Sequence, residues 1–60
     1  MINLKEKRKN KGLTQQQLAD KVYVTRQIIS AYETGRTRPS IESAKLLGEV
    51  LGFEWSEIYR

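Results

Sequence analysis

Residues 13–35, LTQQQLADKVYVTRQIISAYETG, decide the fold because they contain two closely spaced helix starts. Thr14 and Gln17 have the spacing of a capping box, in which each side chain accepts a hydrogen bond from the other residue's backbone N–H. This pair predicts a helix from about Gln15 to Lys21. Only three residues follow before the next residue that can cap a helix, and so short a connection makes two helices cross steeply.

The second helix of this unit starts after Thr25, which can cap it, and spans about Arg26 to Glu33. Its end is marked by Gly35, because a residue without a Cβ readily adopts the left-handed conformation of a helix C-cap. The steep crossing over residues 22–24 has the spacing of a helix-turn-helix.

Further caps and apolar spacings divide the rest of the chain into helices. Apolar residues three and four positions apart, with no alternating stretch long enough for a strand, favour helix throughout. We predict one all-α domain over residues 1–60 with five helices, since so short a chain has material for one core only. The outer helices are expected over about Ile2 to Asn10, from the cap Ser40 to Gly52, and over about Trp55 to Tyr59. Their core residues are expected to include Ile41, Leu47, Leu51, Phe53 and Ile58.

The residue types that the sequence lacks close most routes to catalysis. It has no Cys and no His, which removes disulfides, thiolate chemistry, a Cys/His zinc site and an imidazole base. Nothing places Glu42, Glu49, Glu54 or Glu57 as a converging pair of carboxylates. We expect no enzyme, no catalytic residue, no metal and no cofactor. Apolar runs reach only three or four residues, so we expect no membrane contact either.

Charge is distributed unevenly along the chain. Eleven Lys and Arg against seven Asp and Glu give a net charge of +4, and a basic balance favours a polyanionic partner. Residues 1–38 carry nine basic and three acidic side chains, a net of +6, whereas residues 39–60 carry two and four, a net of −2. The two parts should have different partners. Taken alone, the basic run from Lys5 to Lys11 favours a solvated helix face over a nucleic-acid patch.

Several short motifs follow one another in a definite order. In that order and at that spacing, from about Leu4 to Ile58, the sequence resembles the phage repressor and Cro proteins and the bacterial xenobiotic-response-element-type regulators. The resemblance implies a five-helix, lambda-repressor-like DNA-binding domain whose third helix enters the major groove, usually as a two-fold dimer on a palindromic operator. The motifs are Leu13-Thr14-Gln15, Leu18-Ala19, Val24-Thr25, Ile29-Ser30, Tyr32-Glu33-x-Gly35, Pro39-Ser40 and Leu51-Gly52-Phe53.

The start of the third helix is expected to read the bases. A helix in the major groove leads with its first turns, so the exposed side chains there are the specificity candidates. Gln27 can pair with N6 and N7 of adenine, Arg26 with O6 and N7 of guanine, and Ile28 can meet a thymine methyl group. Ile28 is assigned to this surface because its neighbour Ile29 is assigned to the core. Ala31, one turn further, stands where the family that the sequence resembles often carries a longer polar residue, so its contact is absent or limited to close approach.

Phosphate contacts are expected from cap and loop residues. Thr14 and Gln15 lie at the start of the second helix, where free backbone N–H groups favour an anion. Thr25 is expected both to cap the third helix and to face phosphate. Arg36 and Arg38 follow that helix and should flank the groove.

Two positions are interpreted through the resemblance. The family pattern pairs the positions of Arg8 and Glu33 in a partly buried salt bridge, which makes Arg8 structural although it lies in the basic run. Tyr23 departs from the pattern, because this turn position commonly holds Gly. A residue with a Cβ costs about 1 kcal/mol or more in the left-handed conformation. The turn is therefore either slightly strained or different in geometry.

Four apolar residues, Leu46, Val50, Trp55 and Tyr59, remain after the core has been assigned. We expect them to form a homodimer seam with a symmetric, self-matching patch. In the alternative, Leu46 and Val50 complete the contact with the first helix and Trp55 covers the edge of the core. A dimer would read half-sites one turn of DNA apart, roughly 34 Å.

These features predict a sequence-specific transcriptional regulator that binds double-stranded DNA as a homodimer. Repression is expected because occupying an operator is the simplest action of such a domain. We expect a cytoplasmic protein encoded by a bacterium or phage, nucleoid-associated when bound, and no small-molecule effector is indicated. The alternative is a protein-interaction module on the same fold, an antitoxin or antirepressor partner, whose acidic end binds another protein while DNA contact is secondary.

Overall fold

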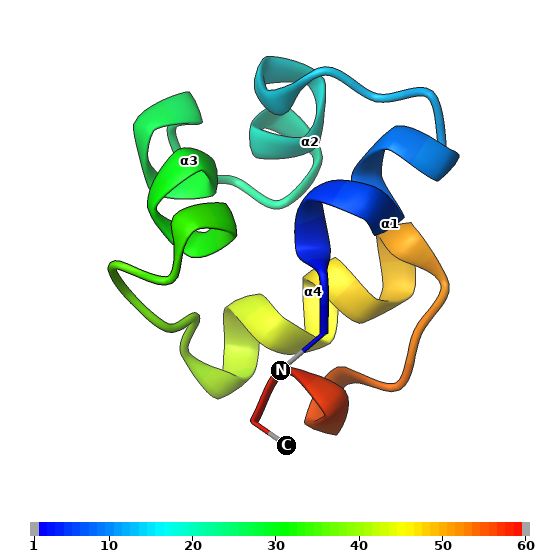
Figure 1. Cartoon of the computed structure of the whole chain (residues 1–60), viewed down its shortest axis with the longest axis vertical. Helices are drawn as coiled ribbons and strands as arrows, with labels where there is room; N and C mark the ends of the chain where they lie inside the picture. The colour runs from blue at the N-terminus through cyan, green and yellow to red at the C-terminus, as the bar shows by residue number, and fades with distance from the viewer. Residues whose placement is uncertain (1, 60) are drawn as a thin grey trace.

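The computed structural model describes residues 2–59, which contain four α-helices, one short 3₁₀ helix and no strand (Figure 1). The all-α fold is therefore as predicted. The fifth element is a single stretch of 3₁₀ helix, so the count of five helices is not confirmed as such. The elements are α1 (Leu4–Asn10), α2 (Gln15–Lys21), α3 (Arg26–Thr34), α4 (Ile41–Leu51) and the 3₁₀ helix η1 (Trp55–Tyr59).

Each α-helix begins directly after a polar residue that caps it. The side chains of Asn3, Thr14, Thr25 and Ser40 each accept a hydrogen bond from the backbone N–H three residues further on. At α2 the capping box is complete, because the backbone N–H of Thr14 donates to Gln17 Oε1 at 2.8 Å. These short-range bonds satisfy N–H groups that have no partner inside the helix.

The two ends of the domain differ from the sequence-based expectation. Helix α1 starts at Leu4 instead of Ile2, because Asn3 has an extended backbone and caps the helix. In η1 the backbone N–H of Glu54 donates to Glu57 Oε2 at 3.0 Å, which fixes the first turn. The whole element is a 3₁₀ helix of five residues. This form occurs mainly in such short stretches.

The core lies where the four α-helices and η1 meet. Helix α2 packs against α3, α1 contacts α3, and α4 packs against η1. Three side chains at the centre, Leu18, Ile29 and Leu47, have no exposed surface. The other buried apolar residues are Leu4, Ala19, Val22, Tyr32, Ala44, Leu51 and Ile58.

Two residues predicted to belong to the core are not buried. Ile41 is 58% exposed, because it is the first residue of α4 and the apolar stripe of that helix meets the core only one turn later. Phe53 is partly buried and packs against the edge of the core. The other predicted residues Leu47, Leu51 and Ile58 are buried.

Helix α4 and the segment after it approach each other most closely at Gly48. A Cβ on this residue would lie 2.7 Å from the carbonyl oxygen of Phe53 and 3.2 Å from the backbone nitrogen of Trp55. Both neighbours are backbone atoms, which cannot turn away as a flexible side chain can. Gly48 therefore allows η1 to lie against α4.

The turn between α2 and α3 keeps a left-handed residue. Tyr23 has φ +62°, and it is the only non-glycine residue with a positive φ among residues 2–59. Of the two alternatives for this turn, the structure shows the strained turn. The backbone of Tyr23 adopts a left-handed conformation, which is unfavourable for a residue with a Cβ.

Candidate nucleic-acid interface

The first turn of α3 presents three consecutive side chains to solvent. Arg26 and Gln27 are exposed and Ile28 is 38% exposed, whereas Ile29 is fully buried. The side chains of Arg26 and Gln27 form no hydrogen bond or ion pair with any other described residue. Their donors and acceptors are therefore available to a ligand, beside an apolar side chain that the core does not use. Ala31, one turn further along, is partly buried.

Two capping threonines stand at the starts of α2 and α3. Thr14 Oγ1 accepts from the backbone N–H of Gln17 at 3.0 Å, and Thr25 Oγ1 accepts from that of Ile28 at 3.2 Å. In this role each hydroxyl uses only its acceptor side. Each O–H can still donate a hydrogen bond to an external oxygen.

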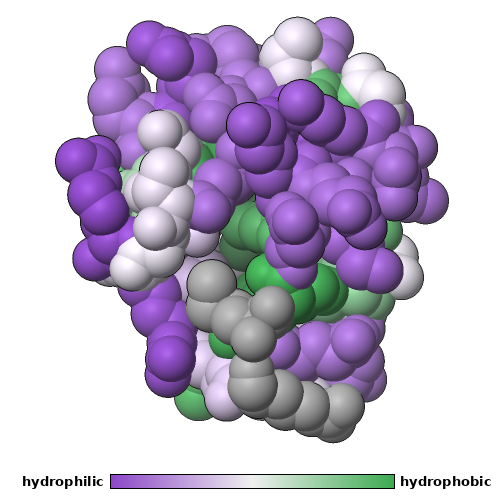
Figure 2. Space-filling model, viewed as in Figure 1, coloured by the Kyte–Doolittle hydropathy of each residue, from purple (hydrophilic) through white to green (hydrophobic). Residues whose placement is uncertain are grey.

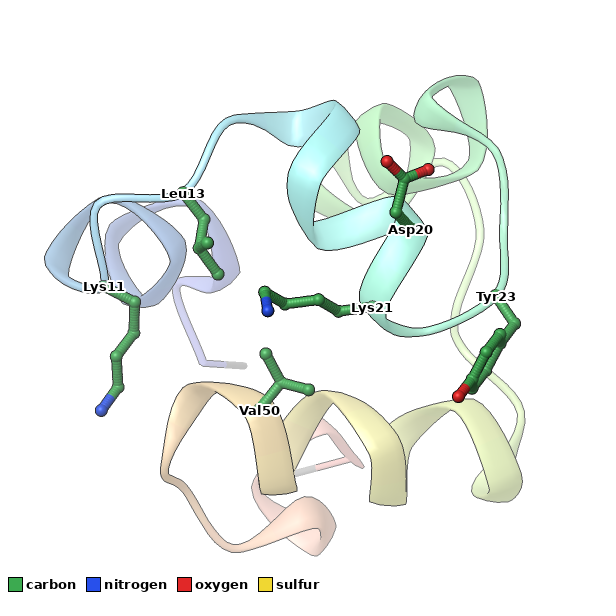
Figure 3. Close-up of a pocket in the computed structure, with 6 residues that line it drawn as sticks. All are labelled: Lys11, Leu13, Asp20, Lys21, Tyr23 and Val50. Atoms are coloured by element: carbon green, nitrogen blue, oxygen red, sulfur yellow. The ribbon is translucent and has the colours of Figure 1, made fainter.

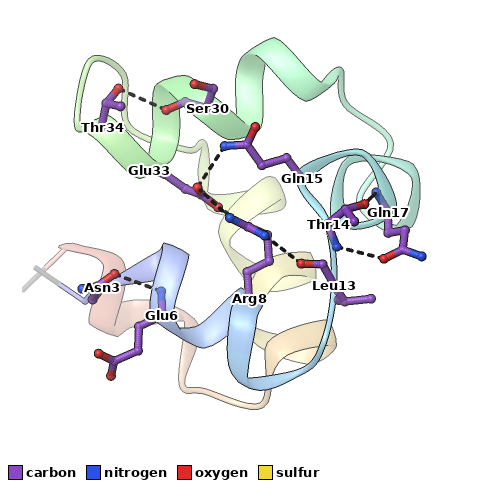
Figure 4. Close-up of polar contacts among 10 residues, drawn as sticks. All are labelled: Asn3, Glu6, Arg8, Leu13, Thr14, Gln15, Gln17, Ser30, Glu33 and Thr34. Atoms are coloured by element: carbon purple, nitrogen blue, oxygen red, sulfur yellow. Dashed lines mark hydrogen bonds and ion pairs between the residues drawn. The ribbon is translucent and has the colours of Figure 1, made fainter.

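Arg8, Glu33, Gln15 and the carbonyl group of Leu13 form one network of charged and polar groups, the Arg8 network (Figure 4). Arg8 Nε lies 2.6 Å from Glu33 Oε2, so the ion pair implied by the family resemblance is present. Arg8 Nη1 donates to the Leu13 oxygen at 2.7 Å, and Arg8 Nη2 donates to Glu33 Oε1 at 3.4 Å. The Arg8 and Glu33 side chains are only 9% and 3% exposed.

Gln15 joins this network from the start of α2. Its amide Nε2 donates to Glu33 Oε1 at 3.1 Å, so the side chain that was expected to face a phosphate rests against a carboxylate. A glutamine amide has two N–H donors, and the second remains for another acceptor. The network thus links α1, the loop before α2, the start of α2 and the end of α3. Sequence reasoning missed the Gln15 contact, because no local pattern brings Gln15 to a residue eighteen positions away.

The loop after α3 carries the two remaining cationic candidates. Arg36 and Arg38 are both exposed. The backbone N–H of Arg36 donates to the carbonyl oxygen of Ala31 at 3.0 Å, which keeps the loop folded against the end of α3. The Arg38 guanidinium lies 5.6 Å from the centre of the Tyr59 ring, so this side chain also contacts η1.

The four residues expected at a dimer seam are partly buried against their own core: Leu46, Val50, Trp55 and Tyr59. The structure brings the two aromatic rings together, edge to face, with their centres 6.2 Å apart. Lys45 Nζ lies 5.3 Å from the Trp55 ring centre. The Tyr59 hydroxyl donates to the carbonyl oxygen of Pro39 at 2.7 Å. This last contact was not foreseen, because twenty residues separate its partners.

The face of the molecule that Figure 2 shows is mostly polar. On the face in Figure 2, hydrophilic side chains cover most of the surface, and hydrophobic ones show mainly in a band near its middle. In the described part of the chain no three His, Cys, Asp or Glu side chains are grouped so that they could hold a metal ion. No helix within residues 2–59 is long and apolar enough to cross a membrane.

Comparisons with known proteins agree with this geometry. A helix-turn-helix family model matches residues 4–58. The chain is 48% identical over 54 residues to an HTH-type transcriptional regulator of Methanothermobacter thermautotrophicus, covering 90% of this chain and 78% of that protein. It is 38% identical over 53 residues to the HTH-type transcriptional regulator YqaF of Bacillus subtilis, covering 88% and 70%.

A third relative is considerably longer than this chain. The HTH-type transcriptional activator BcrR of Enterococcus faecalis is 38% identical over 55 residues, which are 92% of this chain and 27% of that protein. The comparison with solved structures gives no match. With its capped α2 and α3, its left-handed turn and these relatives, the chain belongs to the Cro/C1-type helix-turn-helix family of DNA-binding transcriptional regulators.

Proposed function

We propose that this regulator binds a palindromic operator as a homodimer, with α3 in the major groove, and that it represses transcription. We further propose that it is a cytoplasmic protein encoded by a bacterium or a phage. The observation that carries the proposal is the start of α3, where Arg26 and Gln27 are exposed without partners and Ile28 stands beside them. A helix enters the groove with this end leading. Occupancy of an operator by this surface is sufficient for repression.

The chemistry of these side chains sets the expected sequence preference. Gln27 can offer a donor and an acceptor together to adenine, and Arg26 can donate twice to guanine. Ile28 suits a thymine methyl group. Ala31 is too short for a hydrogen bond with a base edge, so the readout covers few base pairs in each half-site.

Side chains that can bind phosphate lie at the starts of α2 and α3 and in the loop after α3, and they support this proposal. Thr14 and Thr25 have hydroxyls that can still donate, and Arg36 and Arg38 extend from the loop after α3. Gln15 would use its second N–H for a phosphate while Glu33 fixes the direction of its amide. Sequence-independent contacts of this kind set the register of the helix on the duplex.

The dimer part of the proposal rests on the second half of the chain. Leu46, Val50, Trp55 and Tyr59 keep part of their surface exposed although they touch the core. A two-fold seam through these residues would bury the exposed part and set two copies of α3 at a fixed separation. Two half-sites one turn apart, roughly 34 Å, are the expected operator.

Selection of binding sites from a randomised duplex library, beside light scattering of the free protein at the same concentration, tests the proposal. The expected result is an enriched palindrome and a dimeric mass. Uniform, salt-sensitive binding with no enriched sequence would instead favour a protein-interaction module, an antitoxin or antirepressor partner, with secondary DNA contact. A reporter gene with the selected site across its promoter then separates repression from activation.

Substitution of Gln27 tests the assigned role of α3. Gln27→Ala should remove discrimination of about 1–3 kcal/mol at one base position in each half-site and leave the melting temperature unchanged, because the side chain is exposed. Gln16→Ala is the matched control, since Gln16 is exposed on α2 and bonds only to Asp20. Equal effects of the two variants on the selected site would contradict base reading by Gln27.

A further inference from the structure

A groove lies on the surface away from the residues proposed to contact DNA. It has a volume of about 570 Å³ and is bounded by the end of α1, the last turn of α2, the turn that follows, and α4 (Figure 3). None of the residues assigned above to bases or phosphates lines it. The lining residues are Lys11, Leu13, Asp20, Lys21, Tyr23 and Val50.

Tyr23 is the most informative residue of this groove. Its side chain is 84% exposed, so the fold gains little from burying the ring. Its backbone has φ +62°, a conformation that glycine adopts freely and that asparagine tolerates better than an aromatic residue. The fold alone therefore favours a different residue at this position. Strained backbone positions of this kind cluster at binding sites and other functional sites.

The rest of the groove combines positive charge with apolar surface. In Figure 3, the Lys21 side chain extends from α2 across the groove, and its ammonium group ends between the side chains of Leu13 and Val50. Both of these apolar residues are partly buried. Lys11 and Lys21 form no ion pair with any described residue. The lining thus carries two ammonium groups and one carboxylate, that of Asp20, with Lys11 at one end and the exposed Tyr23 ring at the other (Figure 3).

We propose that this groove docks a segment of a partner protein in which carboxylates stand next to an aliphatic or aromatic side chain. The carboxylates would bind the ammonium groups of Lys11 and Lys21. The apolar side chain would pack on the Tyr23 ring and on the surface of Leu13. Val50 also lines the groove, but it belongs to the proposed dimer seam and is not part of this contact. Tyrosine is enriched at protein interfaces.

The apolar part of the lining favours a protein segment over a nucleic acid, because the sugar-phosphate backbone of a duplex has no apolar side chain to match Leu13 and the Tyr23 ring. Asp20 also lies in the lining, where it accepts a hydrogen bond from Gln16 at 2.9 Å. Its negative charge repels a phosphate and a carboxylate alike, so it does not distinguish the two partners. Because the groove and the start of α3 share no residue, the protein could bind DNA and this partner together.

The first test is selection of short peptides from a random displayed library on the immobilised full chain. We expect enriched peptides to carry Asp or Glu beside Leu, Ile, Phe or Trp. A labelled copy of the most enriched peptide is then titrated with the protein by fluorescence anisotropy, with and without saturating duplex DNA. The expected affinity is the same in both titrations. Failure to enrich acidic peptides, or displacement of the peptide by DNA, would overturn the proposal.

Tyr23→Gly separates a binding role of the ring from a structural one. Glycine relieves the left-handed strain, so the melting temperature should rise while peptide affinity falls about tenfold, which corresponds to roughly 1.4 kcal/mol. A structural defect would move both quantities downward. Unchanged peptide affinity would show that the ring takes no part in binding and would refute the proposal.

The charge requirement is tested with two matched lysine variants. Lys21→Gln should weaken the acidic peptide severalfold, whereas Lys5→Gln, at an exposed position of α1 outside the groove, should leave its affinity unchanged. Equal losses would indicate general attraction to a basic surface. A lower salt dependence of DNA binding in Lys21→Gln would assign the groove to nucleic acid. Loss of dimeric mass in Lys21→Gln or Tyr23→Gly would assign it to a second copy of the chain. Each of these three results would overturn the proposal.

Discussion

The two halves of the domain join their helices in different ways. In residues 2–38 the helices meet at a buried ion pair, in which Arg8 and Glu33 are fixed by directed hydrogen bonds. In residues 39–59 the elements meet at Gly48, where the backbone after α4 comes too close to leave room for a Cβ. One junction depends on charge and direction, and the other depends on shape.

This difference matches what each half has to position. The proposed DNA surface combines the starts of α2 and α3, and both must have one fixed relation to the duplex. Hydrogen bonds prefer a narrow range of angles, so a fully satisfied polar network specifies one arrangement. Among the described residues no buried side-chain nitrogen or oxygen lacks a partner. The second half carries no proposed base contact, and close apolar packing is sufficient there.

Arg8→Ala should give the largest loss of stability. It leaves the Glu33 carboxylate buried at 3% exposure without its cation, and removing one partner of a buried pair costs about 3–5 kcal/mol. For a domain of this size about 1 kcal/mol lowers Tm by 4–8 °C. Thermal unfolding followed by circular dichroism should therefore show a fall of at least about 12 °C, before any change in sequence preference.

Two controls make this prediction specific. Lys9→Ala removes one cation from an exposed position of the same helix and should leave Tm nearly unchanged. Arg8→Met combined with Glu33→Met removes both charges and should restore much of the lost stability, since replacing a whole buried pair by apolar residues is often neutral. An unchanged Tm in Arg8→Ala would refute the structural role of Arg8.

The helices of the first half follow from the sequence because their signals are local. Thr14 with Gln17, and Thr25 three residues before Ile28, act within one helical turn, and the structure contains these bonds. Tertiary contacts are different in kind. The amide of Gln15 was expected to face phosphate but rests on a carboxylate eighteen positions away, and no short-range pattern encodes such a contact.

Gly48→Ala should destabilise the other junction, by less than Arg8→Ala. The added methyl group would meet the Phe53 carbonyl oxygen at 2.7 Å, and such overpacking typically costs about 1–3 kcal/mol. Because the strain lies between α4 and η1, we expect a lower Tm with an unchanged operator preference. Glu49→Ala, at the next and exposed position, is the control. A loss of sequence preference in Gly48→Ala would break the distinction between the two halves.

The second half was harder to predict because its apolar residues outnumber the clear core positions. Ile41 fits the apolar stripe of α4 by spacing, yet the stripe begins before the core does and the residue is 58% exposed. Tyr59 was counted only as apolar, but its hydroxyl binds the Pro39 carbonyl group. Spacing indicates which side of a helix is apolar, whereas how far along the helix the core extends depends on the other elements.

Thr14→Ala and Ser40→Ala compare the same local bond in the two halves. Each substitution removes a side-chain oxygen that accepts a hydrogen bond from the backbone N–H three residues further along the helix. Each should therefore lower the free energy of unfolding by about 1 kcal/mol. Chemical denaturation followed by circular dichroism measures both. Only Thr14→Ala should also weaken DNA binding, because Thr14 lies at a proposed phosphate contact. If both variants weakened DNA binding equally, the duplex would have to contact both halves of the domain, and the assignment of DNA binding to the first half would be wrong.

Arg36→Ala and Arg38→Ala should have the smallest effects on stability and test the border between the halves. Both side chains are exposed, and removing a phosphate contact should weaken binding to all sequences alike and lower the salt slope by about 1 per protomer. Only Arg38 also lies over the Tyr59 ring, 5.6 Å from its centre. Arg38→Ala should therefore lower Tm slightly, by the equivalent of about 0.5–1 kcal/mol, and Arg36→Ala should not. A change confined to one base position in either variant would mean that the loop reads bases, and the division between a base-reading helix and a phosphate-binding loop would then be wrong.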